Sequence, residues 1–490
     1  MLVRVLTASS RKIMQRINRA LREISLEKLI NTHLTTLQTL TKALRDDQFR
    51  ASVDQDVIDN LHAVLSRLFV EVKSMSDDVD PEDESVSLCL KLTAECFRAH
   101  RNACVQCTPN QCSLRNLGSI KVSFEILGKL LKITSGGSNV VYDAIRCGIQ
   151  FLGNIAVGNQ LCKDDIWKLG FPHIFWNMLE LPDEKAVSYT CMVLHTCLDD
   201  HKTETLAQDA QQLKVPLKIM DLCRTLPDVD WTVLIATQHF LKSSEITSKM
   251  YTEMTNEERL TLLELILAHL AVGEEEKDSL IPLSLAEFLA SCFTDRCRAV
   301  LTLASQSSAD DQAAVVAIRL LDILCEMTSD RKKFMALQDH PDLLSSTVVL
   351  LKEVHLLGKT SKNVFTAAQD FSSKRPGGAD DHPALSFKAH LIRLIGNLCH
   401  GHSVNQDKVR ELDGIALILD NCSIDSNNPF ISQWAVFAIR NILEHNPENQ
   451  KLIQDLRSQG VADDTMLREM GFRVEERDGS RLLRPLKKDP

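Results

Sequence analysis

The sequence predicts an all-α protein built as a long stack of helical repeats. Three observations predict this fold class: only 18 Gly and 14 Pro occur in 490 residues, aromatic residues make up 5% of the chain, and apolar residues recur at helical spacing. A β-sandwich or barrel of this length would need many more turns and a richer supply of β-branched and aromatic residues. The 44% hydrophobic content also suits a folded chain rather than a disordered one.

The segment 387–400 shows the helical period clearly. Its apolar residues follow the spacing i, i+4, i+7, i+8 and i+11, which places them on one stripe of a helix: Phe387, Leu391, Leu394, Ile395 and Leu398. Comparable stripes predict helices at 57–72, 86–104, 120–133, 143–157, 186–198, 213–226, 231–242, 257–271, 312–327, 342–357 and 434–444. No alternating pattern typical of strands competes with them.

The first 22 residues carry six basic side chains and no acidic one, interleaved with apolar residues. This composition is typical of a mitochondrial presequence or of a basic amphipathic helix. The other interpretation, which we adopt, is an ordinary first helix whose solvent-facing side is basic. Residues 1–50 are therefore treated as a divergent, basic, helical N-terminal segment.

Three interruptions divide the rest of the chain. The acidic stretch 75–85 predicts a solvated loop between helices. Residues 361–386 combine turn residues with charge and few apolar anchors, which predicts a disordered insertion. It separates helical repeats at 51–360 from a C-terminal domain at 387–485, where two glycines flank 472–477 and leave a hairpin or an extended tail open.

An internal repeat is the most informative feature. In four segments a long apolar helix ends near an Asn and is followed by an Asn-Gln pair; the helix residues are Asn102, Asn154, Asn397 and Asn441, and the pairs begin at Asn110, Asn159, Asn405 and Asn449. In three of the four, eight residues separate the helix Asn from the pair. Asn397 and Asn441 are 44 residues apart, within the period of about 40 to 47 residues of the armadillo/HEAT class. The layout resembles that class and implies a right-handed α-solenoid, in which stacking buries the apolar face of each repeat.

The repeated Asn residues are candidates for a partner-binding groove. In armadillo proteins that bind extended peptides, the equivalent Asn hydrogen-bonds the ligand backbone and a Trp precedes it by four residues. Here the preceding residues are Arg98, Gln150, Arg393 and Phe437, which argues against recognition of basic peptides. The alternative is that the Asn side chains satisfy backbone groups between repeats. The groove is expected at Asn102, Asn154, Arg393, Asn397, Phe437 and Asn441.

A polar ridge runs along the predicted helix at 387–400. His390, Arg393 and Asn397 follow the spacing i, i+3 and i+7, opposite the apolar stripe. Such a ridge suits an acidic or phosphorylated peptide bound through the arginine. It is equally compatible with an ordinary solvated face.

Several function classes are disfavoured. Fifteen cysteines without paired spacing indicate reduced thiols, and Cys104 and Cys107 form one Cys-x2-Cys half-site near His100 without a second, so buried packing is preferred to zinc. The phosphate-loop, dinucleotide, nucleophile-elbow and zinc-protease motifs are absent, so neither catalysis nor a cofactor is expected. The net charge of −10 disfavours nucleic acid, and the apolar runs are too short for a membrane span.

Several longer blocks of sequence indicate which family within the armadillo/HEAT class the chain resembles. The stretches 146–156, 318–328 and 387–399, together with Asp425-Ser426-Asn427-Asn428-Pro429-Phe430, resemble the ataxin-10 family. The resemblance covers residues from about 55 to about 485 and is most specific in the last hundred residues.

This resemblance implies a non-enzymatic scaffold that acts in cytokinesis, cilium formation, neuron survival and neurite outgrowth. It also implies self-association, and binding to the O-linked N-acetylglucosamine transferase and to the G-protein β subunit. The implied locations are the cytoplasm, the perinuclear region, the centrosome or basal body, and the midbody. Two alternatives stay open: a regulator of G-protein signalling, and a helical-repeat protein targeted to mitochondria.

Overall fold

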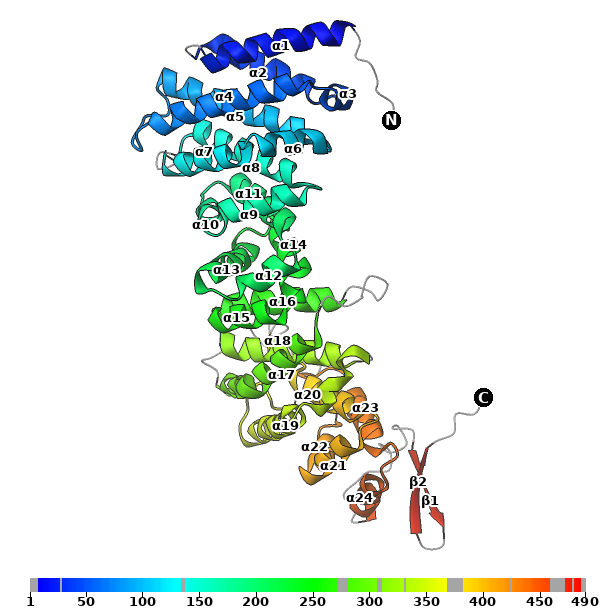
Figure 1. Ribbon diagram of the computed structural model, residues 1–490. Helices are drawn as coiled ribbons and strands as arrows, with labels where there is room; N and C mark the ends of the chain where they lie inside the picture. The colour runs from blue at the N-terminus through cyan, green and yellow to red at the C-terminus, as the bar shows by residue number, and fades with distance from the viewer. Residues whose placement is uncertain are drawn as a thin grey trace. The chain divides into compact units, whose positions relative to one another are not determined.

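The computed structural model describes residues 8–26, 29–133, 137–271, 281–305, 311–329, 332–367, 382–423, 425–458, 472–477 and 480–485. The chain divides into two compact units, Met1–Phe240 and Leu241–Pro490. Both units are built from helices. In the described residues, the only other regular structure is one β-hairpin near the C-terminus (Figure 1). The predicted all-α solenoid is confirmed in each unit, with this hairpin as the exception.

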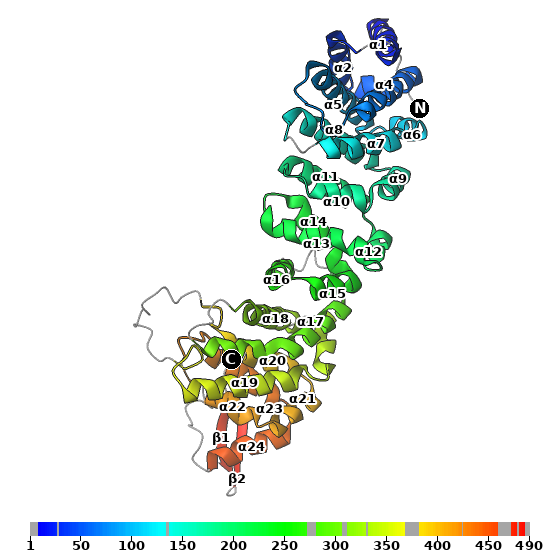
Figure 2. The same cartoon turned by 90° about the vertical axis from the view of Figure 1, so that its left-hand side faces the viewer.

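In the described residues of the first unit there are fourteen α-helices. They are α1 (Ala8–Leu26), α2 (Asn31–Ala43), α3 (Asp47–Ala51), α4 (Gln55–Ser74), α5 (Glu84–Cys104), α6 (Thr108–Asn116), α7 (Ser119–Ile133), α8 (Asn139–Ala156), α9 (Gln160–Gly170), α10 (His173–Leu179), α11 (Glu184–Cys197), α12 (Asp200–Leu206), α13 (Ala210–Thr225) and α14 (Asp230–Gln238). The long helices α2, α5, α8, α11 and α14 pack in sequence against one another (Figure 2). A Cβ at Gly153 of α8 would lie 2.6 Å from Met192 Cε, so α8 and α11 pack closely there and the end of the Met192 side chain would have to move to admit a larger residue.

Helix α1 accounts for the amphipathic pattern at the N-terminus. Met14, Ile17, Leu21 and Ile24 are at most 5% exposed, and α1 packs against α4. The apolar side of α1 therefore belongs to the core of the first unit, while Arg16, Arg19 and Arg22 are exposed. Residues 1–7 lie outside the described residues, and mitochondrial targeting stays an untested alternative.

The second unit repeats the same plan. Its helices are η2 (Phe240–Lys242, at the boundary), α15 (Ser244–Glu253), α16 (Asn256–Ala271), α17 (Leu283–Arg296), η4 (Cys297–Ala304), α18 (Gln312–Thr328), η5 (Lys332–Asp339), α19 (Leu343–Thr360), α20 (Phe387–Cys399), α21 (Ser403–Glu411), α22 (Gly414–Asp420), α23 (Ile431–Leu443) and α24 (Pro447–Ser458). Helices α16, α18, α20 and α23 pack in sequence. Strands β1 (Phe472–Arg477) and β2 (Ser480–Pro485) pair antiparallel from Phe472 with Pro485 to Arg477 with Ser480, so the hairpin alternative is the observed one.

The predicted insertion at 361–386 lies largely outside the described residues, which omit 368–381. Its two flanks are described. Residues 361–367 form turns after α19, and 382–386 lead directly into α20. The disorder predicted for this segment stays a prediction.

Candidate partner-binding surface

The four repeated Asn residues lie in the last turns of long helices, and each connects its helix to the preceding long helix. Three of them are buried, and Asn154 is half-buried. The side-chain amide nitrogens donate from Asn102 to Thr41 O (2.9 Å), from Asn154 to Arg101 O (3.2 Å), from Asn397 to Cys325 O (3.3 Å) and Thr328 Oγ1 (3.0 Å), and from Asn441 to Gly396 O (3.0 Å). These amides therefore bond to backbone carbonyls between repeats instead of facing a partner.

The Asn-Gln pairs satisfy the carbonyls at the ends of the long helices. Gln406 Nε2 donates to Cys399 O at the end of its own long helix, and to Asn441 O and Glu444 O at the end of the next. Gln111 makes the equivalent three bonds to Cys104 O, Asn154 O and Val157 O. Because the last carbonyls of a helix have no partner within it, one glutamine side chain stabilises two helix ends at once.

The second repeat corrects the register that the sequence predicts. Asn159 is the N-cap of α9 and accepts a hydrogen bond from Cys162 N, as Asn446 does from Asn449 N. Asn159 therefore corresponds to His402, the N-cap of α21, and not to Asn405. In this repeat Cys162, eight residues after Asn154, takes the position that Asn405 has after Asn397. Matching Asn159-Gln160 with the other Asn-Gln pairs is thus wrong by three residues.

The same arrangement shows one residue that the sequence pattern missed. Gln338 in η5 donates to Asn397 O (3.2 Å), Leu398 O (3.3 Å) and His400 O (2.9 Å), so it plays the part of Gln111 and Gln406. No Asn precedes it, and the pair motif therefore could not reveal it.

The polar ridge of α20 is packed against α18. His390 Nδ1 lies 2.7 Å from Asp322 Oδ1, and Arg393 Nη1 donates to Glu326 Oε1 at 2.9 Å. The Arg393 side chain is only 16% exposed. The interpretation of this ridge as an ordinary solvated face is wrong, because its side chains join two repeats.

Beside Arg393, an aromatic cluster lies along α23. The Arg393 guanidinium lies 4.8 Å from the centre of the Trp434 ring, and Trp434 meets Phe437 edge to face at 5.8 Å. Phe430, the N-cap of α23, is 69% exposed. We call Arg393, Phe430, Trp434 and Phe437 the α23 aromatic surface. Sequence reasoning found Arg393 and Phe437; the i, i+4 and i+7 spacing of the aromatics was the signal for the other two.

The loop before α23 holds Phe430 in place. Asn428 Oδ1 accepts hydrogen bonds from Lys388 N (3.0 Å) and Ala389 N (3.3 Å) in the first turn of α20. Lys388 Nζ also pairs with Asp425 Oδ2 at 3.2 Å, and both side chains are buried. Phe430 itself has a φ of 63°, a conformation that is uncommon for a residue with a bulky side chain. The exposed ring is therefore presented by a fixed backbone.

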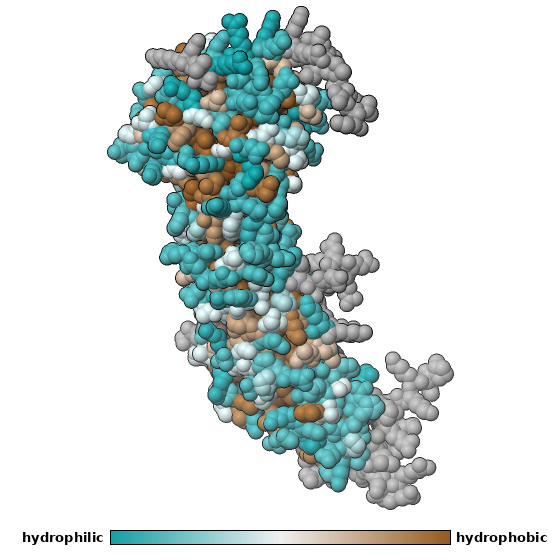
Figure 3. Space-filling view, in the orientation of Figure 1, coloured by the Kyte–Doolittle hydropathy of each residue, from teal (hydrophilic) through white to brown (hydrophobic). Residues whose placement is uncertain are grey.

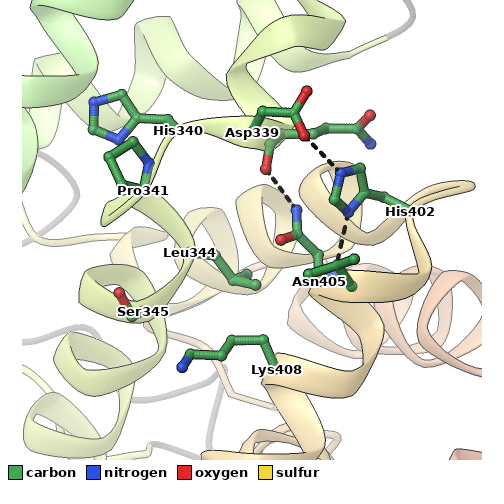
Figure 4. Close-up of a pocket in the computed structure, with 10 residues that line it drawn as sticks. Asp339, His340, Pro341, Leu344, Ser345, His402, Asn405 and Lys408 are labelled. Atoms are coloured by element: carbon green, nitrogen blue, oxygen red, sulfur yellow. Dashed lines mark hydrogen bonds and ion pairs between the residues drawn. The ribbon is translucent and has the colours of Figure 1, made fainter.

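A pocket of about 290 Å³ opens between η5, the start of α19 and α21 (Figure 4). His402 lies between Asp339, whose Oδ1 is 3.0 Å from His402 Nε2, and the backbone nitrogen of Asn405, which donates to His402 Nδ1 (Figure 4). Asn405 Nδ2 donates to Gln338 O. Asp339, His402, Asn405 and Gln338 thus satisfy one another, whereas His340 Nδ1, in the same lining, is buried and has no hydrogen-bond partner among the described residues.

The cysteine-rich region of α5 is packed rather than prepared for a metal. Cys104 and Cys107 are buried, and burial raises the pKa of the Cys104 thiol well above its usual value. Burial also lowers the pKa of His100 to about 3. In the described part of the chain, no three His, Cys, Asp or Glu side chains are grouped as metal ligands. The same part contains no helix that is both long and apolar enough to cross a membrane.

Comparison with known proteins gives the family. The chain is 44% identical to ataxin-10 of Xenopus tropicalis over 460 residues, which cover 92% of each protein. The chain belongs to the ataxin-10 family. Human ataxin-10 is 38% identical over 459 residues, covering 93% of this chain and 95% of the human protein. The model of the spinocerebellar ataxia type 10 protein domain matches residues 387–484, the part that carries the α23 aromatic surface.

Proposed function

We propose that this ataxin-10 family member is a non-enzymatic scaffold that binds protein partners, and that the α23 aromatic surface is one of its contact sites. The observation that supports this site is the 69% exposure of Phe430 on a backbone fixed by Asn428. Exposed aromatic side chains carried by an ordered backbone are typical anchors of protein interfaces, because less entropy is lost when a partner binds. On the face drawn in Figure 3, hydrophobic residues also gather on the first unit, bordered by hydrophilic ones.

The cellular role that we propose follows from the family. It comprises regulation of cytokinesis and cilium formation and support of neuron survival and neurite outgrowth, at the perinuclear cytoplasm, the centrosome or basal body, and the midbody. The proposed partners are the O-linked N-acetylglucosamine transferase, the G-protein β subunit and further copies of the chain. Family membership is the support for these roles; the geometry of α23 supports protein binding alone.

Proximity labelling with the full chain tests this proposal. We expect the double variant Phe430→Ser/Trp434→Ala to lose a defined subset of labelled proteins by roughly tenfold or more, as removal of interface anchors predicts. Val404→Ser is the matched control, because Val404 is 70% exposed in the same unit but lies on α21. A labelled set that is the same for the double variant and the wild type would refute the proposed contact site.

A further inference from the structure

We infer that His402 is a pH-sensitive cap of α21, whose protonation loosens the junction between the repeats on either side of this helix. His402 immediately precedes α21 and lines the pocket drawn in Figure 4. Two features carry the inference: the hydrogen bonds of the imidazole ring, and the side chains that the first turn of α21 extends to neighbouring helices. Neither involves the α23 aromatic surface.

The two ring nitrogens of His402 have opposite roles. Nδ1 accepts a hydrogen bond from the backbone nitrogen of Asn405 at 3.2 Å, and Nε2 lies 3.0 Å from Asp339 Oδ1 (Figure 4). Because a backbone N–H can only donate, Nδ1 carries no proton, and the single proton of the ring is on Nε2, which donates it to the carboxylate. The capped state of α21 therefore requires a neutral ring.

A second proton on the ring of His402 would remove the cap. It would convert Nδ1 from an acceptor into a donor that faces the N–H of Asn405, and it would place a positive charge where the helix dipole is already positive. Histidine is the side chain that gains such a proton between pH 8 and 5. We therefore expect the cap to be present at pH 7.5 and to be lost as the pH falls toward 5.

Charged groups of both signs lie near His402. The Asp339 carboxylate of η5 favours the protonated ring, whereas Lys408 of α21 adds a positive charge to the same pocket lining and disfavours it. The side chains that α19 contributes to the lining are uncharged. The remaining titratable groups nearby are His340 after η5, His400 in the turn before α21, and Glu444, whose Oε2 lies 3.9 Å from His400 Nδ1.

The first turn of α21 holds neighbouring repeats together. Asn405 Nδ2 donates to Gln338 O in η5 at 2.9 Å and to Leu398 O in α20 at 2.8 Å. Gln406 donates to carbonyls at the ends of α20 and α23. Because both side chains belong to the turn that His402 caps, loss of the cap weakens contacts on both sides of α21.

Two other repeats have a cap at the corresponding position that does not titrate. Asn159 caps α9 and Asn446 caps α24 through amide oxygens, each of which accepts from the backbone nitrogen three residues later. An Asn at position 402 can therefore supply the same cap without its pH dependence.

Hydrogen exchange of the full chain tests the inference, when it is measured at pH 7.5, 6.5 and 5.5 and corrected for the intrinsic exchange rate at each pH. In the wild type, protection of residues 403–411 should fall roughly fivefold with the pH, which is the effect of removing one N-cap. His402→Asn should keep its protection at all three pH values. His402→Ala, which lacks a cap, should show low protection of α21 throughout.

His400→Asn is the matched control. His400 is a titratable neighbour with a side chain 62% exposed, but its ring lies beside Glu444 and not at the end of α21, so this variant should show the wild-type fall. Circular dichroism at each pH shows whether each variant is folded.

Three results would overturn the inference: constant wild-type protection between pH 7.5 and 5.5, an equal fall in His402→Asn and wild type, or a fall that disappears in His400→Asn. Each of them would leave the proposed binding of partners at the α23 aromatic surface unaffected, because that proposal is tested by proximity labelling.

Discussion

Asn441 donates its side-chain amide to the carbonyl oxygen of Gly396, 3.0 Å away, where the backbones of α20 and α23 lie close together. The contact combines two needs of a helical stack. The glycine lets the two backbones approach, and the amide satisfies a carbonyl between neighbouring repeats. Close packing of the two helices and hydrogen bonding of a backbone carbonyl between them therefore occur at the same place in the repeat.

Gly396→Ala should destabilise the C-terminal repeats. The new Cβ would lie 2.9 Å from Ala438 Cα and 3.0 Å from a Phe437 ring carbon, so the helices must separate, at a cost of about 1–3 kcal/mol. Urea unfolding followed by circular dichroism measures the change. Gly128→Ala in α7 is the control, since no atom lies within 4 Å of its Cβ position and alanine is the better helix former. Equal stabilities for the two variants would contradict the packing argument.

Gln406→Ala should weaken the junction between the last two repeats. It removes a buried amide that donates to three carbonyls, and the acceptors left behind cost about 1–3 kcal/mol. Hydrogen exchange should show faster exchange in α23 and α24. Gln433→Ala, on the exposed side of α23, is the control and should leave the exchange rates as they are in the wild type.

Lys388→Met should be among the most damaging single changes. It removes the buried ammonium that pairs with the Asp425 carboxylate, which is 3% exposed, and breaking a buried ion pair from one side costs about 3–5 kcal/mol. Lys388→Arg keeps the charge and should cost less. Thermal unfolding of the two variants checks the order, and a Met variant as stable as wild type would show that the pair is dispensable.

Histidine burial predicts a dependence of stability on pH. The folded-state pKa of His100 is about 3, lowered by burial from 6.5, so below pH 6.5 the unfolded state binds a proton that the folded state does not. Stability is thus fully present above pH 6.5 and is lost as the pH falls toward 3, by up to about 1.4 kcal/mol per pH unit from this group. Urea unfolding between pH 7.5 and 5 should show a shallower loss for His100→Phe. Parallel curves for variant and wild type would argue against a buried neutral histidine.

The sequence predicts the long helices well, because their apolar stripes are a local property: the stripe at 387–400 matches α20 at Phe387–Cys399. The repeated Asn positions were also found from spacing. Their bonding partners were not, since a carbonyl on the preceding repeat has no signature in the sequence. The N-cap position shows the same limit: Cys107, Asn159, His402 and Asn446 all occupy it, so residue identity alone could not set the register.

The contact of Arg393 with Trp434 is a second feature that the sequence could not predict. The two residues are 41 positions apart, and only the packing of α20 on α23 brings the guanidinium to the ring. Spacing on a single helix predicted the ridge of α20 but not the neighbour that covers it.

The loop before α23 has a practical consequence for protein engineering. Asn427 Nδ2 donates to Thr366 O at 2.8 Å, and its carbonyl accepts from Ser386 N at 2.9 Å, so the same residue holds the chain on both sides of 368–381. The distance between these two ends is fixed by Asn427 and not by the residues that connect them. Because the entropy of closing a loop grows only by about 0.6 kcal/mol for each doubling of its length, a fluorescent reporter or an affinity tag placed there should leave both neighbouring helices correctly folded.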